Sequence, residues 1–210
     1  MFVQDVEDTR AIRRDATRVR ILDAAWDLGR RDGLAAITLR EVARRVGMRA
    51  PSLYTYFGSK NAMYDAMYAD AARQLGDTLA GRPRAGDPRE TLRGRMRLFS
   101  GFCVADPVRY QLLFERPVPG FAPAPESFAI TASALAGTRA DMQAAGVTGE
   151  PALDMFRALI TGLVSLQVAN DPGGNRWTGL QDDAFDMFLA HYADGAPRRA
   201  ARRGDPRSSP

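Results

Sequence analysis

The sequence predicts an all-α fold, in which an N-terminal head of three helices precedes a larger C-terminal helical domain, with about nine helices in all. Apolar residues recur at intervals of three and four along nearly the whole chain, and no stretch combines strict alternation with β-branched residues. Capping residues, prolines and glycines divide this pattern into segments of helical length. The 210 residues, 45% of them hydrophobic, can bury one sizeable core or two small ones.

The head is predicted to contain helices over residues 13–31, 39–46 and 51–57. The first follows from a broad apolar stripe of Ala16, Val19, Ile21, Leu22, Ala25, Trp26 and Leu28. Thr38 and Glu41 stand three apart, the spacing of a capping box, and predict where the second helix begins. Pro51 suits the first turn of the third helix, because its missing amide hydrogen would have no partner there.

The C-terminal domain is predicted to contain helices over residues 60–80, 88–102, 107–114, 126–145, 151–170 and 180–193. Ser59, Asp87 and Asp106 stand where N-terminal caps are expected. Four prolines among residues 116–125 exclude a continuous helix there.

Three units are therefore predicted. Residues 13–60 form the head, residues 61–195 form the C-terminal domain, and residues 196–210 form a basic disordered tail.

Composition excludes several classes of protein. One cysteine, Cys103, cannot form an internal disulfide, and with one histidine, His191, it cannot supply the usual zinc ligands. No run approaches the roughly 18 apolar residues of a membrane span, and the first residues lack the apolar stretch of a signal peptide. We therefore expect a cytoplasmic protein without a metal, a cofactor or a membrane partner.

Charge is unevenly distributed along the chain. Residues 10–60 carry eleven arginines and Lys60 against five acids, which gives +7, whereas residues 61–197 carry twelve arginines against sixteen acids, which gives −4. A basic segment joined to a mildly acidic one is typical of a polyanion-binding module attached to another domain. Chance unevenness of surface charge is the alternative.

The second and third predicted helices are short and joined around Gly47, which is the arrangement of a helix-turn-helix. The third helix offers many polar and aromatic side chains, Arg49, Ser52, Tyr54, Thr55 and Tyr56, and only Leu53 and Phe57 as core anchors. Such a helix indicates a partner surface, and nearby arginines suit phosphates.

These residues resemble the TetR (TetR/AcrR) family of transcriptional regulators, from ILDAAWDLGRRDG through ITLREVARRVGMRAPSLYTYFGSKNAMYDAM, Ile21 to Met67. The resemblance implies that Thr38 and Arg40 contact phosphates of operator DNA. It also implies a groove-facing set of Arg49, Ala50, Pro51, Ser52 and Thr55, with Tyr54 and Tyr56 reaching phosphates or base edges and Lys60 clamping a phosphate.

The chemistry of these side chains limits that assignment. Arg49 can make the bidentate contact to guanine, but the other residues are unselective, so the operator sequence cannot be read from the helix. Packing of Tyr54 or Tyr56 against the first helix remains an alternative, and so does a purely solvated role for Arg44 and Arg45.

The C-terminal domain exceeds what DNA binding requires, so we expect it to sense a ligand, to dimerise or both. Its phenylalanines and methionines suit an apolar cavity, which the resemblance also implies, and core packing is the alternative for each. The candidate pocket residues are Phe99, Phe102, Cys103, Tyr110, Phe114, Phe121, Met155 and Thr161. Thr161 stands where a subgroup of the family often has a histidine, and Cys103 is interpreted as an inert, packed thiol.

The helix over 151–170 is apolar on both sides, so both sides must be covered. The resemblance implies a homodimer through the last two helices. The candidate interface residues are Ala158, Gly162, Ser165, Ala169, Phe185, Phe188, Leu189 and Tyr192.

The predicted function is that of a homodimeric transcriptional repressor, released from a palindromic operator by a small apolar or amphipathic effector of unknown identity. A DNA-binding adaptor whose C-terminal domain binds a protein is one alternative. An all-helical enzyme is the other, and the absence of a glycine-rich phosphate loop and of a Gly-x-Ser-x-Gly elbow argues against it.

Overall fold

The computed structural model describes residues 2–81 and 86–193, and over these ranges the chain is helical without a strand ladder. The helices are α1 (Phe2–Asp32), α2 (Leu39–Arg45), α3 (Ala50–Leu53), α4 (Lys60–Ala80), α5 (Pro88–Ala105), α6 (Pro107–Phe114), α7 (Pro125–Ala144), α8 (Glu150–Asn170) and α9 (Gln181–Tyr192). The predicted all-α fold is confirmed. The predicted tail, residues 196–210, lies outside the described residues.

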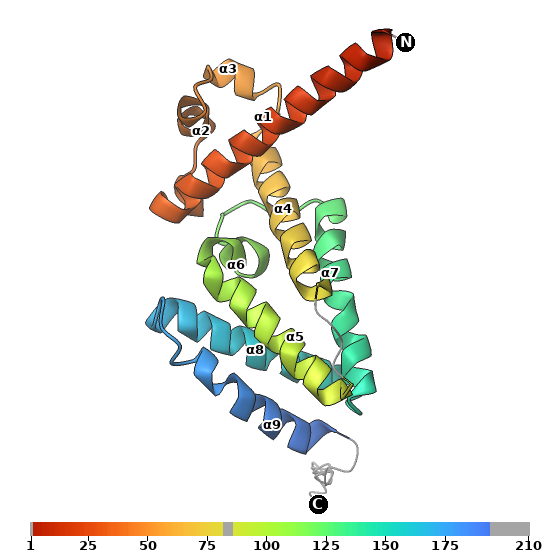
Figure 1. Ribbon diagram of the computed structural model, residues 1–210. Helices are drawn as coiled ribbons and strands as arrows, with labels where there is room; N and C mark the ends of the chain where they lie inside the picture. Colours follow the sequence, from red (N-terminus) through yellow and green to blue (C-terminus); the bar gives the residue numbers. More distant parts are fainter. Residues whose placement is uncertain (1, 82–85, 194–210) are drawn as a thin grey trace, which may run out of the picture.

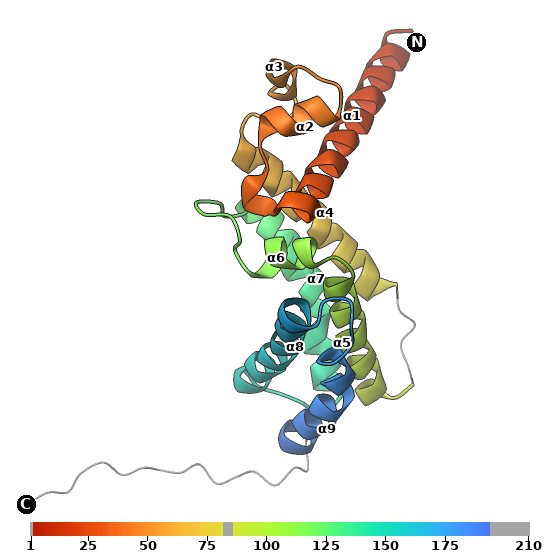
Figure 2. The same cartoon turned by 90° about the vertical axis from the view of Figure 1, so that its left-hand side faces the viewer.

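The helices are arranged as a head and a body joined by one helix (Figures 1 and 2). The head comprises α1, α2 and α3, and the body comprises α5 to α9. Helix α4 begins in the head, runs into the body and packs along α7. At the far end of the molecule α8 packs against both α5 and α9.

The predicted N-terminal caps are confirmed. Side-chain oxygens of Thr38, Ser59, Asp87 and Asp106 each accept a hydrogen bond from a backbone amide two or three residues further on. The capping box at the start of α2 is incomplete, because the Glu41 carboxylate accepts hydrogen bonds from the Arg44 guanidinium instead of returning to the backbone of Thr38.

Helix α1 begins eleven residues earlier than the predicted start at residue 13. Its predicted apolar stripe is wrong at its N-terminal end, because Ala16 and Val19 are exposed and the continuous burial begins at Ile21. The residues before Ile21 contain no proline or glycine that would end the helix, and five arginines are among them, so they extend the helix without contributing to the core.

Helix α3 is shorter than predicted and ends at Leu53 instead of Phe57. The amides of Tyr56 and Phe57 both donate to the Leu53 carbonyl, at 2.9 and 3.0 Å. This shared acceptor tightens the chain into a turn, and it lets Leu53 and Phe57 both point into the core.

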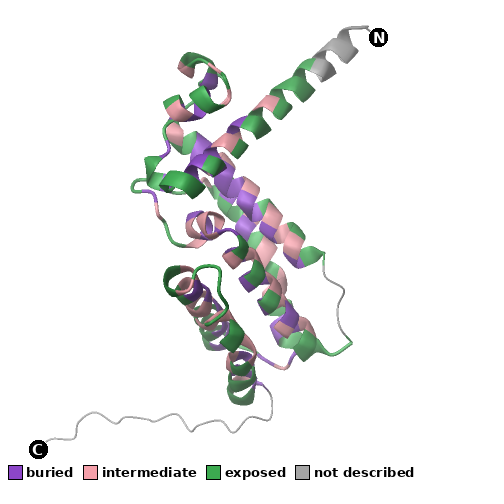
Figure 3. Ribbon diagram, turned by 60° about the vertical axis from the view of Figure 1, so that its left-hand side comes forward, coloured by how far each residue is buried: buried purple, intermediate pink, exposed green. Residues whose placement is uncertain are grey.

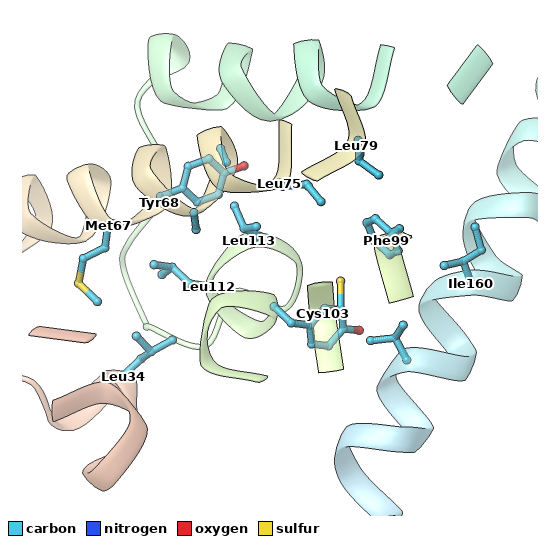
Figure 4. Close-up of a cluster of buried hydrophobic side chains, with 14 of the residues drawn as sticks. Leu34, Met67, Tyr68, Leu75, Leu79, Phe99, Cys103, Leu112, Leu113 and Ile160 are labelled. Atoms are coloured by element: carbon cyan, nitrogen blue, oxygen red, sulfur yellow. The ribbon is translucent and has the colours of Figure 1, made fainter. Parts of the chain in front are cut away.

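The buried side chains form one continuous cluster that extends from Ile21 in the head to Ala193 at the end of α9. Figure 3 shows that the buried residues are concentrated along α4 and on the inner faces of its neighbours. Met67, Tyr68, Leu75 and Leu79 of α4 lie in one row in Figure 4, close to Leu112 and Leu113 of α6. The head and the body therefore share a core.

Cys103 lies within this cluster and is fully buried (Figure 4). Burial raises the pKa of its thiol, because the thiolate would lose its hydration. A protonated, inaccessible thiol is unreactive, which agrees with the interpretation of Cys103 as a packed residue.

Buried and half-buried side chains attach the head to α4 by hydrogen bonds. The Tyr64 hydroxyl donates to the Leu34 carbonyl at 2.5 Å, and the Trp26 indole N–H donates to the Asp70 carboxylate at 3.2 Å. Burial raises the pKa of Tyr64 to about 12, so this phenol remains a donor at neutral pH.

Asp106 attaches the head to α6. Its carboxylate caps α6 and also accepts a hydrogen bond from the Arg30 guanidinium of α1 at 2.7 Å. The two helices approach closely beside this pair, since a Cβ atom added at Gly29 would lie 3.2 Å from a methyl group of Val108. Asp106 therefore fixes both the start of α6 and its position against α1.

By length and composition α8 is long and apolar enough to cross a membrane. Its inner face, with Leu153, Phe156 and Ile160 buried, packs against α5 and α9. We therefore assign it as a core helix.

We expect Asp106→Ala to lower the free energy of unfolding by about 1 to 3 kcal/mol, because it removes a helix cap and a charged hydrogen-bond acceptor together. Urea denaturation measures the change. The control is Asp27→Ala, since Asp27 pairs with the same Arg30 at 3.0 Å but is mostly exposed. For this control we expect a change of less than about 0.5 kcal/mol. Equal losses in the two variants would contradict the role assigned to Asp106.

Candidate nucleic-acid interface and apolar cavity

The α2–α3 pair is held against α1 by a small set of core residues. Val42, Leu53 and Phe57 are buried, and they fix the two short helices by their inner sides. Gly47 in the connecting turn has a φ of +72°, a left-handed conformation that favours glycine. The outer sides of α2 and α3 are therefore presented to solvent in a fixed orientation.

None of the ten candidate DNA-binding residues is buried. Seven are exposed, Thr38, Arg40, Arg49, Pro51, Ser52, Tyr54 and Thr55, and three are half-buried, Ala50, Tyr56 and Lys60. The two tyrosines differ: Tyr54 is 54% exposed, whereas Tyr56 packs partly against the core. The alternative of packing against the head thus applies to Tyr56 and not to Tyr54.

Arg49 and Lys60 occupy different positions at this surface. Arg49 is the residue preceding α3, and among the described residues none bonds to its guanidinium. The Lys60 ammonium donates to the Ala35 carbonyl at 3.1 Å and lies 5.3 Å from the ring centroid of Tyr64. Arg49 is therefore free to reach a base edge, while Lys60 is a fixed charge at the start of α4.

The arginines of α2 are not equivalent. Arg44 forms an ion pair with Glu41 at 2.6 Å, and this pairing lowers the pKa of the Glu41 carboxyl. Arg45 lies at 3.9 Å from the same carboxylate. The Glu41 carboxylate thus offsets one of the two positive charges of Arg44 and Arg45, whereas Arg40 is exposed and has no such partner among the described residues.

Arginines of α1 also reach this surface, and they were not among the predicted site residues. Arg14 donates to the Thr55 carbonyl at 3.5 Å, and Arg18 donates to the Tyr56 carbonyl at 3.2 Å. The guanidinium of Arg18 also lies over the Phe57 ring, 4.4 Å from its centroid. The signal was present in the sequence, because these arginines continue the face of α1 that is buried further along.

The body contains an apolar cavity of about 170 Å³. It lies among α4, α5, α6, α7 and α8, and its lining includes Met96, Phe99, Phe114, Phe156, Arg157 and Thr161. A larger and more open groove, of about 930 Å³, runs between α4, α5 and α7. Arg95, paired with Asp141 at 2.5 Å, lines both of these spaces. The smaller space is the better candidate for an apolar ligand, because phenyl rings surround it.

Three of the eight candidate pocket residues, Phe99, Phe114 and Thr161, line this cavity. The other five do not, which corrects the prediction. Cys103 and Tyr110 are buried in the core, and Phe102 packs beside it. Phe121 contacts the Tyr64 ring near the head, with 5.5 Å between centroids, and Met155 is 48% exposed on the outer face of α8.

The candidate interface residues divide between the outer and inner faces of the last two helices. Ala158, Gly162 and Ala169 lie on the outer side of α8, exposed or half-buried. Ser165 is half-buried, and its side chain forms a hydrogen bond with that of the buried Tyr110. On α9, Phe185, Phe188 and Leu189 are buried inside the chain, and Tyr192 is half-buried against Phe188. These four residues lie on the side of α9 that packs against α5 and α8, so they are not the surface that α9 offers to a partner.

Comparison with known proteins agrees with this geometry. Residues 21–67 match the family described as "Bacterial regulatory proteins, tetR family". The HTH-type transcriptional regulator Mb1846 of Mycobacterium bovis is 34% identical over 149 residues, which cover 66% of this chain and 62% of that protein. The match thus spans less than two thirds of this relative's length. The matched family and relatives are named as transcriptional regulators and not as enzymes.

Solved structures share the fold. The crystal structure of SCO4313 has a TM-score of 0.71 at 26% identity and covers 86% of this chain and 98% of that one. RolR, solved in complex with the ligand resorcinol, has a TM-score of 0.56 at 17% identity, with 84% of this chain and 89% of that chain covered.

An exposed helix-turn-helix at the N-terminus, a helical body behind it and the matches over both parts lead to the same assignment. The resemblance to the tetR family of bacterial regulatory proteins is thus confirmed over residues 21–67, and the fold of the described chain is shared with solved regulators.

Proposed function

We propose that the protein is a DNA-binding transcriptional regulator that acts in the cytoplasm as a homodimeric repressor and is released from a palindromic operator by a small ligand with one ring. The observation that carries this proposal is the surface of α2 and α3, where seven of ten candidate DNA-binding residues are exposed and none is buried. We assign DNA binding to residues 13–60 and ligand binding and dimerisation to residues 61–195.

Contacts to DNA divide by chemistry. Thr38, Arg40 and Lys60 suit phosphates, because they offer a hydroxyl and two cations at the edges of the helix pair. Arg49 is the residue able to make a bidentate contact to guanine, which discriminates between bases by about 1 to 3 kcal/mol. Tyr54, half exposed beside it, adds a hydroxyl within the same surface.

Dimerisation is supported by apolar side chains on the outer faces of α8 and α9. Met155, Leu159, Gly162 and Leu166 recur at the spacing of one face of α8. Leu180, Ala184, Met187 and His191 recur at the same spacing at the start of and along α9, and Met187 is 75% exposed. A second copy of the chain would cover both faces about a two-fold axis.

The cavity limits the size of the ligand. A volume of about 170 Å³ is close to that of a cavity known to hold one benzene molecule. Thr138, Thr161 and Arg157 supply polar groups at its wall, so we infer a single-ring ligand with a polar substituent. RolR, a protein of the same fold, binds a ligand of this class, resorcinol.

Helix α6 provides the route from this cavity to the DNA-binding surface. Phe114 at its C-terminal end lines the cavity, and Asp106 before its first turn holds Arg30 of α1. A ligand that displaces Phe114 would move α6, and through the Asp106–Arg30 pair it would change the position of α1. Repression would be relieved if the ligand favours an arrangement of the two heads that does not fit successive major grooves.

For DNA binding we expect Arg49→Ala and Lys60→Ala to behave differently. Arg49→Ala should weaken binding to a selected operator by about 5- to 150-fold and reduce the preference for operator over scrambled duplex. Lys60→Ala should weaken binding to both duplexes by the same factor and reduce the slope of log K against log salt by about 1. Fluorescence anisotropy titrations of both duplexes measure these effects, and circular dichroism confirms folding. The reverse pattern would refute the assignment of base and phosphate contacts.

For dimerisation we expect the double variant Leu166→Asp/Met187→Asp to raise the Kd of the dimer by at least about 30-fold, which corresponds to about 2 kcal/mol, because it would bury unpaired carboxylates in an apolar interface. Analytical ultracentrifugation measures the change. Ile12→Asp/Phe128→Asp is the control, because both of these apolar side chains are exposed elsewhere, at 69% and 58%. A wild-type protein that sediments as a monomer would refute the dimer.

For ligand binding we expect phenols or benzoates to raise the melting temperature by about 5 to 10 °C at a hundredfold excess over Kd. The same compounds should release the protein from its operator. Thr161→Phe, which fills the cavity, should abolish the shift, and Thr148→Phe, at an exposed position outside it, should not. A compound that raises the melting temperature through this cavity without weakening DNA binding would contradict the release mechanism.

A further inference from the structure

Helix α1 extends well beyond the part that the core requires. Its described side chains before Ile21 are exposed, apart from the half-buried Thr17. Figures 1 and 2 show this part of the helix projecting from the head toward the N-terminus, on the same side of the body as α2 and α3. Since these residues do not contribute to the core, the side chains on this part of α1 are available for another role.

The two sides of this extension differ in character. Arg10, Arg14 and Thr17 recur at the spacing that places them on the same face as Ile21, which is fully buried. Ile12 and Val19 lie on the opposite face and are 69% and 56% exposed. The face of α1 that is apolar against the core thus becomes basic where it passes α3.

A groove of about 420 Å³ lies between this basic face and the end of α3. Arg10, Arg13, Arg14 and Thr17 line one wall, and Thr55 and Tyr56 line the other. No carboxylate is among these lining residues of the described chain. Three arginines and three residues with hydroxyl groups therefore line the same space. The hydroxyls of Thr17 and Thr55 also donate to the carbonyls of Arg13 and Ser52.

Hydrogen bonds within the chain fix the end of the groove that lies next to the turn after α3. Arg14 and Arg18 donate to the carbonyls of Thr55 and Tyr56, so the turn after α3 is tied to α1. The guanidinium groups of Arg10 and Arg13 have no hydrogen bond or ion pair within the described residues. These two guanidinium groups are available to an anion from outside.

Guanidinium and hydroxyl groups around an open groove are suited to phosphate oxygens. Thr55 and Tyr56 belong both to this groove and to the candidate DNA-binding surface, so an anion held here lies next to a duplex held by α3. We propose that the groove between the N-terminal half of α1 and the end of α3 is a second phosphate-binding site, which holds the sugar–phosphate backbone of the operator beside the half-site. This inference rests on the proposed function.

The test compares Arg10→Ala/Arg13→Ala with the control Arg89→Ala/Arg176→Ala, in the full chain. The control removes the same charge from exposed positions in the body. The probes are random-sequence duplexes about three helical turns long and the tightest-binding duplex selected from them. Affinity is measured by anisotropy over a range of salt concentrations.

We expect the α1 double variant to lower the affinity for both probes by about tenfold and the slope of log K against log salt by about 1.8, corresponding to two phosphate contacts. The ratio of the two affinities should stay unchanged, and Arg10→Lys/Arg13→Lys should restore the slope. Circular dichroism verifies that each variant is folded.

The outcomes separate this inference from the proposed function. If the wild-type chain binds the duplexes but the α1 variant has the slope of the control, the second site is refuted and the proposed function stands. A fall in the ratio of the two affinities also refutes a backbone contact, since the loss would then be base-specific. If the wild-type chain binds no duplex at low salt, both are refuted.

Discussion

The burial of one face of α4 along its whole length is the constraint on which the rest of the molecule depends. Met63 and Tyr64 near its start are covered by the head, and Leu75 and Leu79 near its end are covered by the body. The burial of each such side chain stabilises the fold by about 1.5 to 3 kcal/mol. Separating either end of α4 from its neighbours therefore costs several kcal/mol. The Tyr64 hydroxyl and the Asp70 carboxylate then fix the head to this helix by hydrogen bonds of defined direction. The position of the DNA-binding surface is set by this packing.

Most helix boundaries could be predicted because they are encoded locally. Thr38, Ser59 and Asp106 satisfy backbone amides in their own first turn, whatever surrounds them. The two errors have a different origin. The start of α1 carries no apolar periodicity, and the end of α3 depends on Leu53 and Phe57 reaching the same core. Neither can be derived from a short stretch of sequence.

A candidate site could be predicted best where its residues lie close together in the sequence. The residues of the helix-turn-helix lie on one short segment, and the side chains that the pattern marks as outward-facing are not buried. The cavity and the helix surfaces of the body are formed by segments distant in sequence. Periodicity shows that α9 has an apolar side, but it cannot tell that α5 and α8 of the same chain already cover Phe185 and Phe188. Periodicity also gives the face of α1 on which Arg14 and Arg18 lie, but it does not give their neighbour, the turn after α3, which is about forty residues away.

The length of α4 has a mechanical consequence. Its 21 residues span about 31 Å, and its two ends belong to different parts of the molecule. The helix therefore acts as a lever: a tilt of about 5° about its body end moves its head end by about 3 Å. That displacement is close to the 3.4 Å separation of successive base pairs. A rearrangement too small to disturb the packing of the body is therefore large on the scale at which a duplex is read.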